Sequence, residues 1–206
     1  MDLARADRYV KGLFEASPRH AREFGFREKY AHTQRVVLWA KRLLKTEPAD
    51  AYLLLTAAIF HDAGYAVSPE NHPARGAEIC ESYLVKGGYD QDFTARAAFC
   101  VLHHGDKSRL RDPETPGELV LLIEADCLEE TGAMSVLRDA LAEGSGGRGD
   151  YRRTYERLLQ RSILQRPDAF PCATETARKI WEEKKRLYID FVKSLAGDLG
   201  ETWEEP

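Results

Sequence analysis

Residues 53–64 read LLLTAAIFHDAG, and this stretch decides the fold because an apolar run ends on a histidine and an aspartate. His61 extends the helical stripe that contains Leu54 and Ala58, so its side chain is expected to face the core. An ionised carboxylate beside apolar surface needs a cation or hydrogen-bond donors, or it gives up its charge. The sequence therefore predicts that His61 and Asp62 form a buried pair whose partner is a metal ion.

The rest of the chain follows the same helical period. Apolar residues recur at three- and four-residue spacing, whereas the two-residue alternation of strands is hard to find, which predicts an all-α fold. The expected helices cover about 2–16, 28–45, 50–61, 74–85, 90–104, 118–126, a segment after Gly132, 151–164 and 174–195. Asp50 is expected to cap the third helix and Gly64 to close it. The GSGGRG run at 144–149 has the spacing of a dinucleotide-binding turn but follows a helix, so we interpret it as a loop.

Composition limits the class of protein. A chain of 206 residues with 43% hydrophobic residues is long enough for a sizeable core, and one domain is expected. The formal net charge of −4 gives no reason to expect binding to duplex nucleic acid. The four cysteines form no CxxC pair, so reduced, packed thiols are expected. The first residues alternate charged and apolar side chains, which is not typical of a signal peptide or membrane span, and a cytoplasmic location is expected.

Two further side chains join the buried pair. His32 shares a helical stripe with Val36, and Asp126 completes a stripe with Leu122. A solitary histidine on an apolar face is more often a packed, hydrogen-bonded residue. However, two buried aspartates repel each other unless a cation lies between them, and neutral imidazoles bind divalent first-row metals well. The sequence therefore predicts a metal shell made of His32, His61, Asp62 and Asp126.

Three more histidines lie near helix ends. His72 precedes Pro73, which suits a first helical turn. His103 and His104 are adjacent, and neighbouring helical residues point about 100° apart. We expect one of the two to bind metal and the other to meet substrate or solvent, and the residues alone leave open which is which. The alternative is a helix C-terminus that simply favours cationic histidine.

The order His32, then His61 and Asp62, then His104, then Asp126 resembles the HD superfamily of metal-dependent phosphohydrolases. The segments IEADCLEETGAMSVLR and ATETARKIWEEKKRLYIDFVKSL are also similar to segments of small bacterial HD hydrolases. The resemblance implies an HD-domain helical bundle with the metal site at its centre. It also implies a single domain over 1–206, with a metal-binding core at about 28–130 and C-terminal helices at 151–197 packing on it.

The resemblance further implies the cofactor. His32, His61, Asp62 and Asp126 would hold one divalent metal, which could be Mn, Fe, Ni, Co, Mg or Zn. The phrase HPARGAEI with the later HH is similar to the motif of HD-GYP phosphodiesterases, in which extra histidines hold a second metal. By that resemblance His72 and either His103 or His104 would bind it, with Asp62 bridging. No GYP signature follows His104, so cyclic di-GMP is not expected, and small nucleotide hydrolases are the nearer comparison.

The expected function is hydrolysis of a nucleotide or another small phosphoester or phosphoanhydride by a metal-activated water. The predicted catalytic residues are Asp62, His103 and His104, and the histidine that is not on metal would protonate the leaving oxygen. Arg35, Lys107 and Arg109 are predicted to meet the phosphate, although such residues are more often solvated surface.

Two other classes of protein stay open at this point. A non-catalytic nucleotide-sensing module could share the fold, but all expected ligands are present, which counts against a degenerate site. A di-iron oxygenase is disfavoured because no histidine has a glutamate three residues before it, yet the ligand types do not exclude iron. Long amphipathic helices are compatible with a homodimer.

Overall fold

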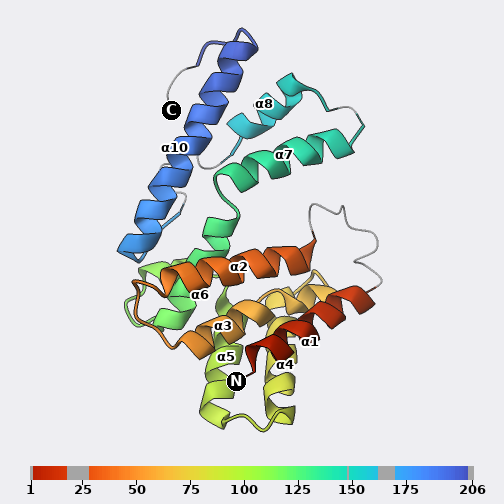
Figure 1. Ribbon diagram of the computed structural model, residues 1–206, viewed down its shortest axis with the longest axis vertical. Helices are drawn as coiled ribbons and strands as arrows, with labels where there is room; N and C mark the ends of the chain where they lie inside the picture. Colours follow the sequence, from red (N-terminus) through yellow and green to blue (C-terminus); the bar gives the residue numbers. More distant parts are fainter. Residues whose placement is uncertain (1, 18–27, 148, 162–169, 204–206) are drawn as a thin grey trace. The chain divides into compact units, whose positions relative to one another are not determined.

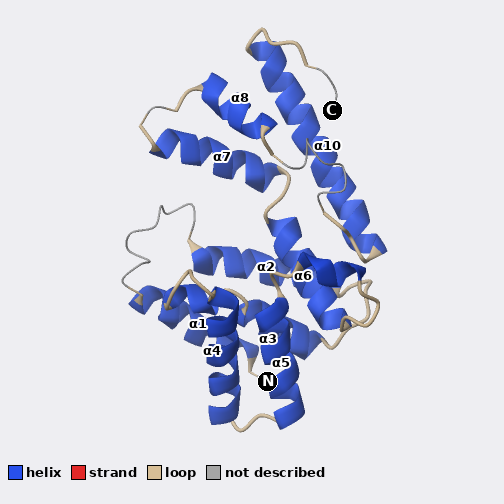
Figure 2. Cartoon of the chain, turned by 180° about the vertical axis from the view of Figure 1, so that it is seen from behind, coloured by secondary structure: helices blue, strands red, loops and turns tan. Residues whose placement is uncertain are grey.

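A computed structural model describes residues 2–17, 28–147, 149–161 and 170–203. Within these ranges the regular secondary structure is helical throughout and no strand occurs (Figure 2), which confirms the predicted all-α fold. None of the helices in these ranges has the length and apolar character that crossing a membrane requires.

The chain divides into two compact units, Met1–Glu129 and Glu130–Pro206. The single domain expected over 1–206 stays a prediction. The first unit (Figure 1) contains α1 Leu3–Ala16, α2 Lys29–Leu43, α3 Ala51–Phe60, the 3-10 helix η3 Ala63–Ala66, α4 His72–Lys86, α5 Gln91–His103, the 3-10 helix η4 Lys107–Arg111 and α6 Gly117–Glu129. These bounds agree closely with the expected helices of this part of the chain.

Helix α3 is the centre of the first unit. It packs against α1, α2, α5 and α6, and every residue from Leu53 to Phe60 is buried. This burial on all sides explains why its sequence is a nearly continuous apolar run rather than a one-sided stripe. Because His61 and Asp62 follow immediately, the chain delivers both polar side chains into the middle of the unit.

Short acidic side chains fix where two helices of the first unit begin. The carboxylate of Asp50 accepts hydrogen bonds from the backbone amides of Tyr52 and Leu53, and Asp90 accepts one from the amide of Phe93. Such caps satisfy donors that have no partner inside the helix. The predicted cap at Asp50 is therefore confirmed. It fixes where α3 begins, and His61 follows the last residue of that helix.

Gly64 does not close α3 as the sequence suggested. Helix α3 ends at Phe60, and Gly64 lies inside η3 without the left-handed backbone of a closing glycine. A Cβ at Gly64 would lie 2.1 Å from the carbonyl oxygen of His72 and 2.7 Å from the amide nitrogen of Gly76. Glycine is required here because η3 and the start of α4 touch through their backbones.

The second unit contains α7 Ala133–Ser145, α8 Tyr151–Leu159 and α10 Glu175–Asp198. Asp139 of α7 is fully buried and forms ion pairs with Arg157 and Arg161, which joins α7 to the α8 segment. The glycine-rich run begins in the last turn of α7, which includes Gly144 and Ser145, so the predicted loop starts two residues later than the sequence suggested. Gly147, after the end of α7, lies in the left-handed region. The expected helix at 151–164 is described to Leu159, and residues 162–169 lie outside the described residues.

Candidate metal centre

Four histidines and two aspartates from five helices converge in the first unit. His32 lies on α2, His61 and Asp62 follow α3, His72 begins α4, His104 follows α5, and Asp126 lies on α6. Their side chains form two groups of potential metal ligands, which are His32 with His61 and Asp126, and Asp62 with His72 and His104. Within each group the ligand atoms lie within 4.8 Å of one another.

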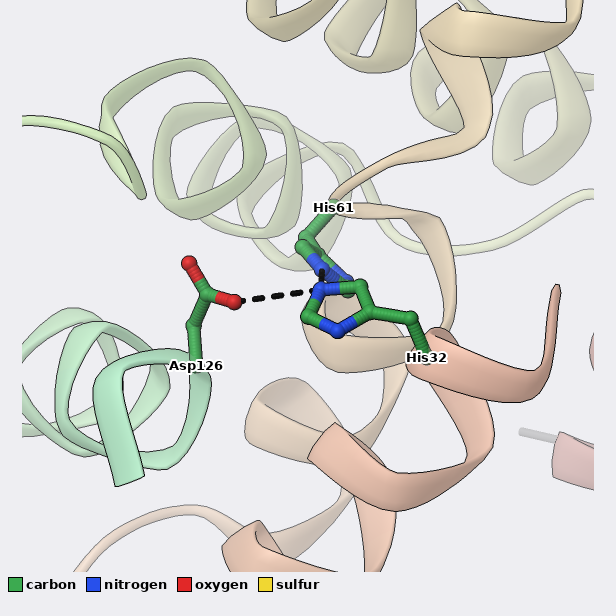
Figure 3. Close-up of side chains that lie close together, drawn as sticks. All are labelled: His32, His61 and Asp126. Atoms are coloured by element: carbon green, nitrogen blue, oxygen red, sulfur yellow. Dashed lines mark hydrogen bonds and ion pairs between the residues drawn. The ribbon is translucent and has the colours of Figure 1, made fainter. Parts of the chain in front are cut away.

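The first group brings three helices together (Figure 3). The Nε2 atom of His32 lies 3.1 Å from Oδ1 of Asp126 and 3.3 Å from Nε2 of His61. Two nitrogen atoms and one carboxylate oxygen therefore point at a common position. This is the ligand chemistry that suits a divalent first-row metal.

Asp62 faces both groups, one with each oxygen. Its Oδ2 atom lies 3.6 Å from Nε2 of His32 and 3.7 Å from Nε2 of His61. Its Oδ1 atom lies 3.5 Å from Nε2 of His72 and 3.6 Å from Nε2 of His104. One carboxylate therefore stands between two sets of histidines, which is the geometry that a bridging ligand needs.

His104 and His103 point in different directions. His104 is buried with its Nε2 toward Asp62, whereas the ring of His103 lies 4.5 Å from that of Phe99. The Nδ1 atom of His103 lies 3.4 Å from a guanidinium nitrogen of Arg109. Of the two neighbours, His104 is the one in the ligand cluster.

The Nδ1 atoms of three cluster histidines are held by acceptors. His61 donates from Nδ1 to the carbonyl of Ala58 at 2.8 Å, and His104 donates to the carbonyl of Val101 at 2.6 Å. His32 has Nδ1 at 2.8 Å from Oε2 of Glu129. A carbonyl oxygen can only accept, so Nδ1 carries the hydrogen and the neutral ring keeps its lone pair on Nε2. Metal-binding histidines are oriented in this way.

The charges in the cluster fit a divalent cation. Burial lowers the pKa of His61 to about 4, so this imidazole is neutral at pH 7. Burial alone would raise the pKa of Asp62, but His61, His104 and Lys29 lower it further than burial raises it. Burial would likewise lower the pKa of His32, yet hydrogen bonds with Asp126 and Glu129 raise it to about 10. The site thus combines ionised carboxylates with a proton on His32 that a metal ion would replace.

Sequence reasoning missed three residues of the site. Glu129 orients His32, and the ammonium of Lys29 lies 2.9 Å from Oδ2 of Asp62 and 3.7 Å from the ring centre of Tyr65. Tyr65 in turn stacks on His72 with ring centres 4.0 Å apart. Lys29 and Glu129 each lie three residues from a predicted ligand on the same helix. That spacing places them on the same helical face and could have indicated both.

The three basic residues predicted for phosphate lie in different surroundings. The guanidinium of Arg35 pairs with Glu129, and that of Arg109 lies 3.6 Å from Asp106 and 5.2 Å from the ring centre of Phe99. Lys107 is exposed at the start of η4. Their roles toward phosphate stay predictions.

Residues 30–131 match the HD domain family. This range contains all six clustered ligands. Among curated proteins, the chain is similar to the uncharacterized protein YpgQ of Bacillus subtilis strain 168, with 26% identity over 173 residues that cover 82% of each chain.

Solved structures share the fold along nearly the whole chain. The crystal structure of Bacillus subtilis YpgQ in complex with ADP superposes with a TM-score of 0.68 at 19% identity, covering 96% of this chain and 98% of that one. An HD-superfamily hydrolase from Bacillus thuringiensis superposes with a TM-score of 0.74 at 17% identity, covering 97% of both chains. With its histidines and aspartates gathered inside the matched range, the chain belongs to the HD superfamily.

Proposed function

We propose that the protein is a metal-dependent phosphohydrolase that acts on a nucleotide or another small phosphorylated molecule. The observation that carries the proposal is the position of Asp62, whose two oxygens face two separate histidine groups. One metal would be held by His32, His61, Asp62 and Asp126, and a second by Asp62, His72 and His104. A divalent metal bound there supplies Lewis-acid chemistry, which brings the pKa of water toward neutrality and stabilises phosphoryl oxygens.

The protein itself contributes position and charge. His61, Asp62 and His104 are buried, and their side chains are held from behind by helix backbone and by other cluster residues. Asp126 and His72 are less buried, with side chains 25% and 22% exposed. A phosphoryl group would therefore enter from the side of Asp126 and His72, while the buried side fixes the ligands and keeps water out.

His103 is our proposed proton donor to the leaving oxygen. Only the imidazolium form of histidine is acidic enough to protonate a leaving oxygen, because a neutral ring does not give up its N–H near pH 7. Burial and the nearby Arg109 lower the pKa of His103, so this form is lost as the pH rises and the proposed step should be faster in acid. A guanidinium nitrogen of Arg109 lies 3.4 Å from Nδ1, which leaves Nε2 as the nitrogen that would donate.

A nucleotide is the favoured substrate class because the relative YpgQ has been crystallised with ADP. The same chemistry would hydrolyse other small phosphoesters, so nucleotides are the first substrates to test and other phosphoesters follow. We further propose that the protein acts in the cytoplasm, in keeping with the predicted absence of a membrane span, and that it forms a homodimer.

The test combines metal analysis with an activity panel. Purified protein loaded with Mn²⁺ would be assayed for phosphate release from nucleotides, phosphomonoesters and phosphodiesters, beside His61→Ala. We expect metal-dependent release by the natural protein and its loss in the variant. Full metal occupancy without turnover across the panel would contradict the hydrolase and support a nucleotide-sensing module. Oxygen uptake without phosphate release would support a di-iron oxygenase.

A further inference from the structure

Lys29 is a cation that stands directly beside the proposed metal ligands. Its ammonium lies 2.9 Å from Oδ2 of Asp62, the oxygen that faces His32 and His61. The aromatic face of Tyr65 lies on another side of the ammonium, 3.7 Å away at the ring centre. Both contacts fix the position of a side chain that would otherwise be mobile.

Lys29 also lies on the open side of the cluster. Its side chain is 26% exposed, similar to that of Asp126 and more than the 5% of Asp62. The ammonium of Lys29 lies over the ring of Tyr65, and the same ring stacks on His72 with ring centres 4.0 Å apart. The ammonium is therefore held near both histidine groups, at the edge from which a phosphoryl group would approach.

Among the described basic residues near the cluster, Lys29 is the best placed for an anion. Arg35 pairs with Glu129, so its guanidinium is one residue removed from the ligand atoms. An ammonium has three donors, and Asp62 takes one of them. A phosphoryl oxygen held beside Asp62 can take another, as lysine commonly does with phosphate.

We propose that Lys29 binds the phosphoryl group of the substrate, a role that rests on the proposed phosphohydrolase function. Tyr65 is the positioning residue that keeps the ammonium over the site. Lys29 is therefore a phosphate contact in addition to Arg35, Lys107 and Arg109, whose roles were predicted from the sequence.

The experiment measures binding rather than turnover. ADP and inorganic phosphate would be titrated into Lys29→Met, Lys29→Arg and the natural protein, each saturated with Mn²⁺ whose content is measured. We expect Lys29→Met to bind ADP at least about tenfold more weakly with unchanged manganese, and Lys29→Arg to restore most of the affinity, because a hydrogen bond to a charged group is worth this much or more. Lys41→Met is the matched control. It removes the same charge from the exposed last turn of the same helix, about 18 Å along the axis.

Two results would overturn the role of Lys29. One is ADP binding by Lys29→Met within about twofold of the Lys41→Met control. The other is equal weakening in Lys29→Met and Lys29→Arg, which would make Lys29 a packing partner of Asp62 and Tyr65. Failure of the hydrolase proposal would give a different result. In that case the natural protein would bind ADP with an affinity that depends on Lys29 but would release no phosphate.

Discussion

The carbonyl oxygen of His72 occupies the space that any side chain on Gly64 would need, since a Cβ there would lie 2.1 Å away. Gly64→Ala must therefore push the start of α4 away from η3, and His72 with it. We expect a loss of about 1–3 kcal/mol in the free energy of unfolding and loss of the proposed second metal. Thermal unfolding and metal analysis would measure both.

Gly12→Ala is the control for this variant. A Cβ at Gly12 meets no atom within 4 Å, and the residue lies inside α1. Alanine there should raise stability by about 0.5–1 kcal/mol because glycine loses more backbone entropy in a helix. Equal stability of Gly64→Ala and Gly12→Ala would show that η3 and α4 are not held together as described.

Removing one histidine from each group should separate the two proposed metal sites. His72 contacts Oδ1 of Asp62, and His61 faces Oδ2. We expect His72→Ala to lower the metal content by one ion and to leave the other tightly bound, whereas His61→Ala should weaken the first site. Metal content per chain after gel filtration is the measurement. A loss of both metals on His72→Ala would mean that the sites are not independent.

Glu129 should tune metal affinity through His32 without binding metal. Its Oε2 atom lies 2.8 Å from Nδ1 of His32. Glu129→Ala should weaken metal binding by about 10- to 100-fold, as is typical for such supporting carboxylates. Glu130→Ala is the matched control. Glu130 is the next residue in the chain, and its carboxylate is exposed and pairs with Arg138. The two affinities can be compared by titration against a chelator, and equal values would remove Glu129 from the site.

Metal binding should release a proton at neutral pH. The pKa of His32 is raised to about 10, because its hydrogen bonds with Asp126 and Glu129 outweigh the effect of burial, so the metal-free ring is protonated at pH 7. His61, with its pKa lowered to about 4 by burial, has no proton to lose. Apparent affinity for Mn²⁺ should therefore rise by about tenfold per pH unit for one displaced proton, up to about pH 10.

The raised pKa of His32 affects the stability of the metal-free fold in the opposite direction to metal affinity. Metal affinity rises with pH, whereas the free energy of unfolding falls. A raised pKa stabilises the folded state below the unfolded value of 6.5, and this contribution is lost as the pH rises through about 10. For the metal-binding prediction, calorimetry of Mn²⁺ binding in two buffers of different ionisation enthalpy would count the protons that leave when the metal binds. Manganese affinity that is constant from pH 6.5 to 8.5 would contradict a protonated His32.

The four cysteines should differ sharply in reactivity. Cys80, Cys100 and Cys127 are buried, whereas Cys172 is partly exposed. Burial raises the pKa of Cys100 to about 12, and it also raises the pKa of Cys80. Since the thiolate is the reactive form, an aromatic disulfide reagent should titrate one thiol quickly in the folded protein and four after unfolding. Rapid reaction of Cys80 or Cys100 in the folded protein would contradict the packing of α4 on α5, because these two thiols lie on those helices.

Much of the candidate site could be predicted because it depends on local pattern. His32, His61 and Asp126 each extend an apolar stripe at helical spacing, and a residue on such a stripe turns toward the core wherever the helix packs. The choice between His103 and His104 could not be predicted. Both lie at the end of α5, and the one that reaches Asp62 depends on how α5 is rotated where it packs against α3 and α4.

By itself, the sequence determined the helices, the cap at Asp50 and the inward face of His32, His61 and Asp126, because periodicity and capping act within a few residues. Only the tertiary structure decided which oxygen of Asp62 faces which histidines, and that Lys29 and Glu129 belong to the site. The hydrogen bond from His32 to Glu129 joins residues 97 positions apart. Contacts of that range depend on how α2, α3 and α6 pack together, and no local pattern encodes the register of three helices.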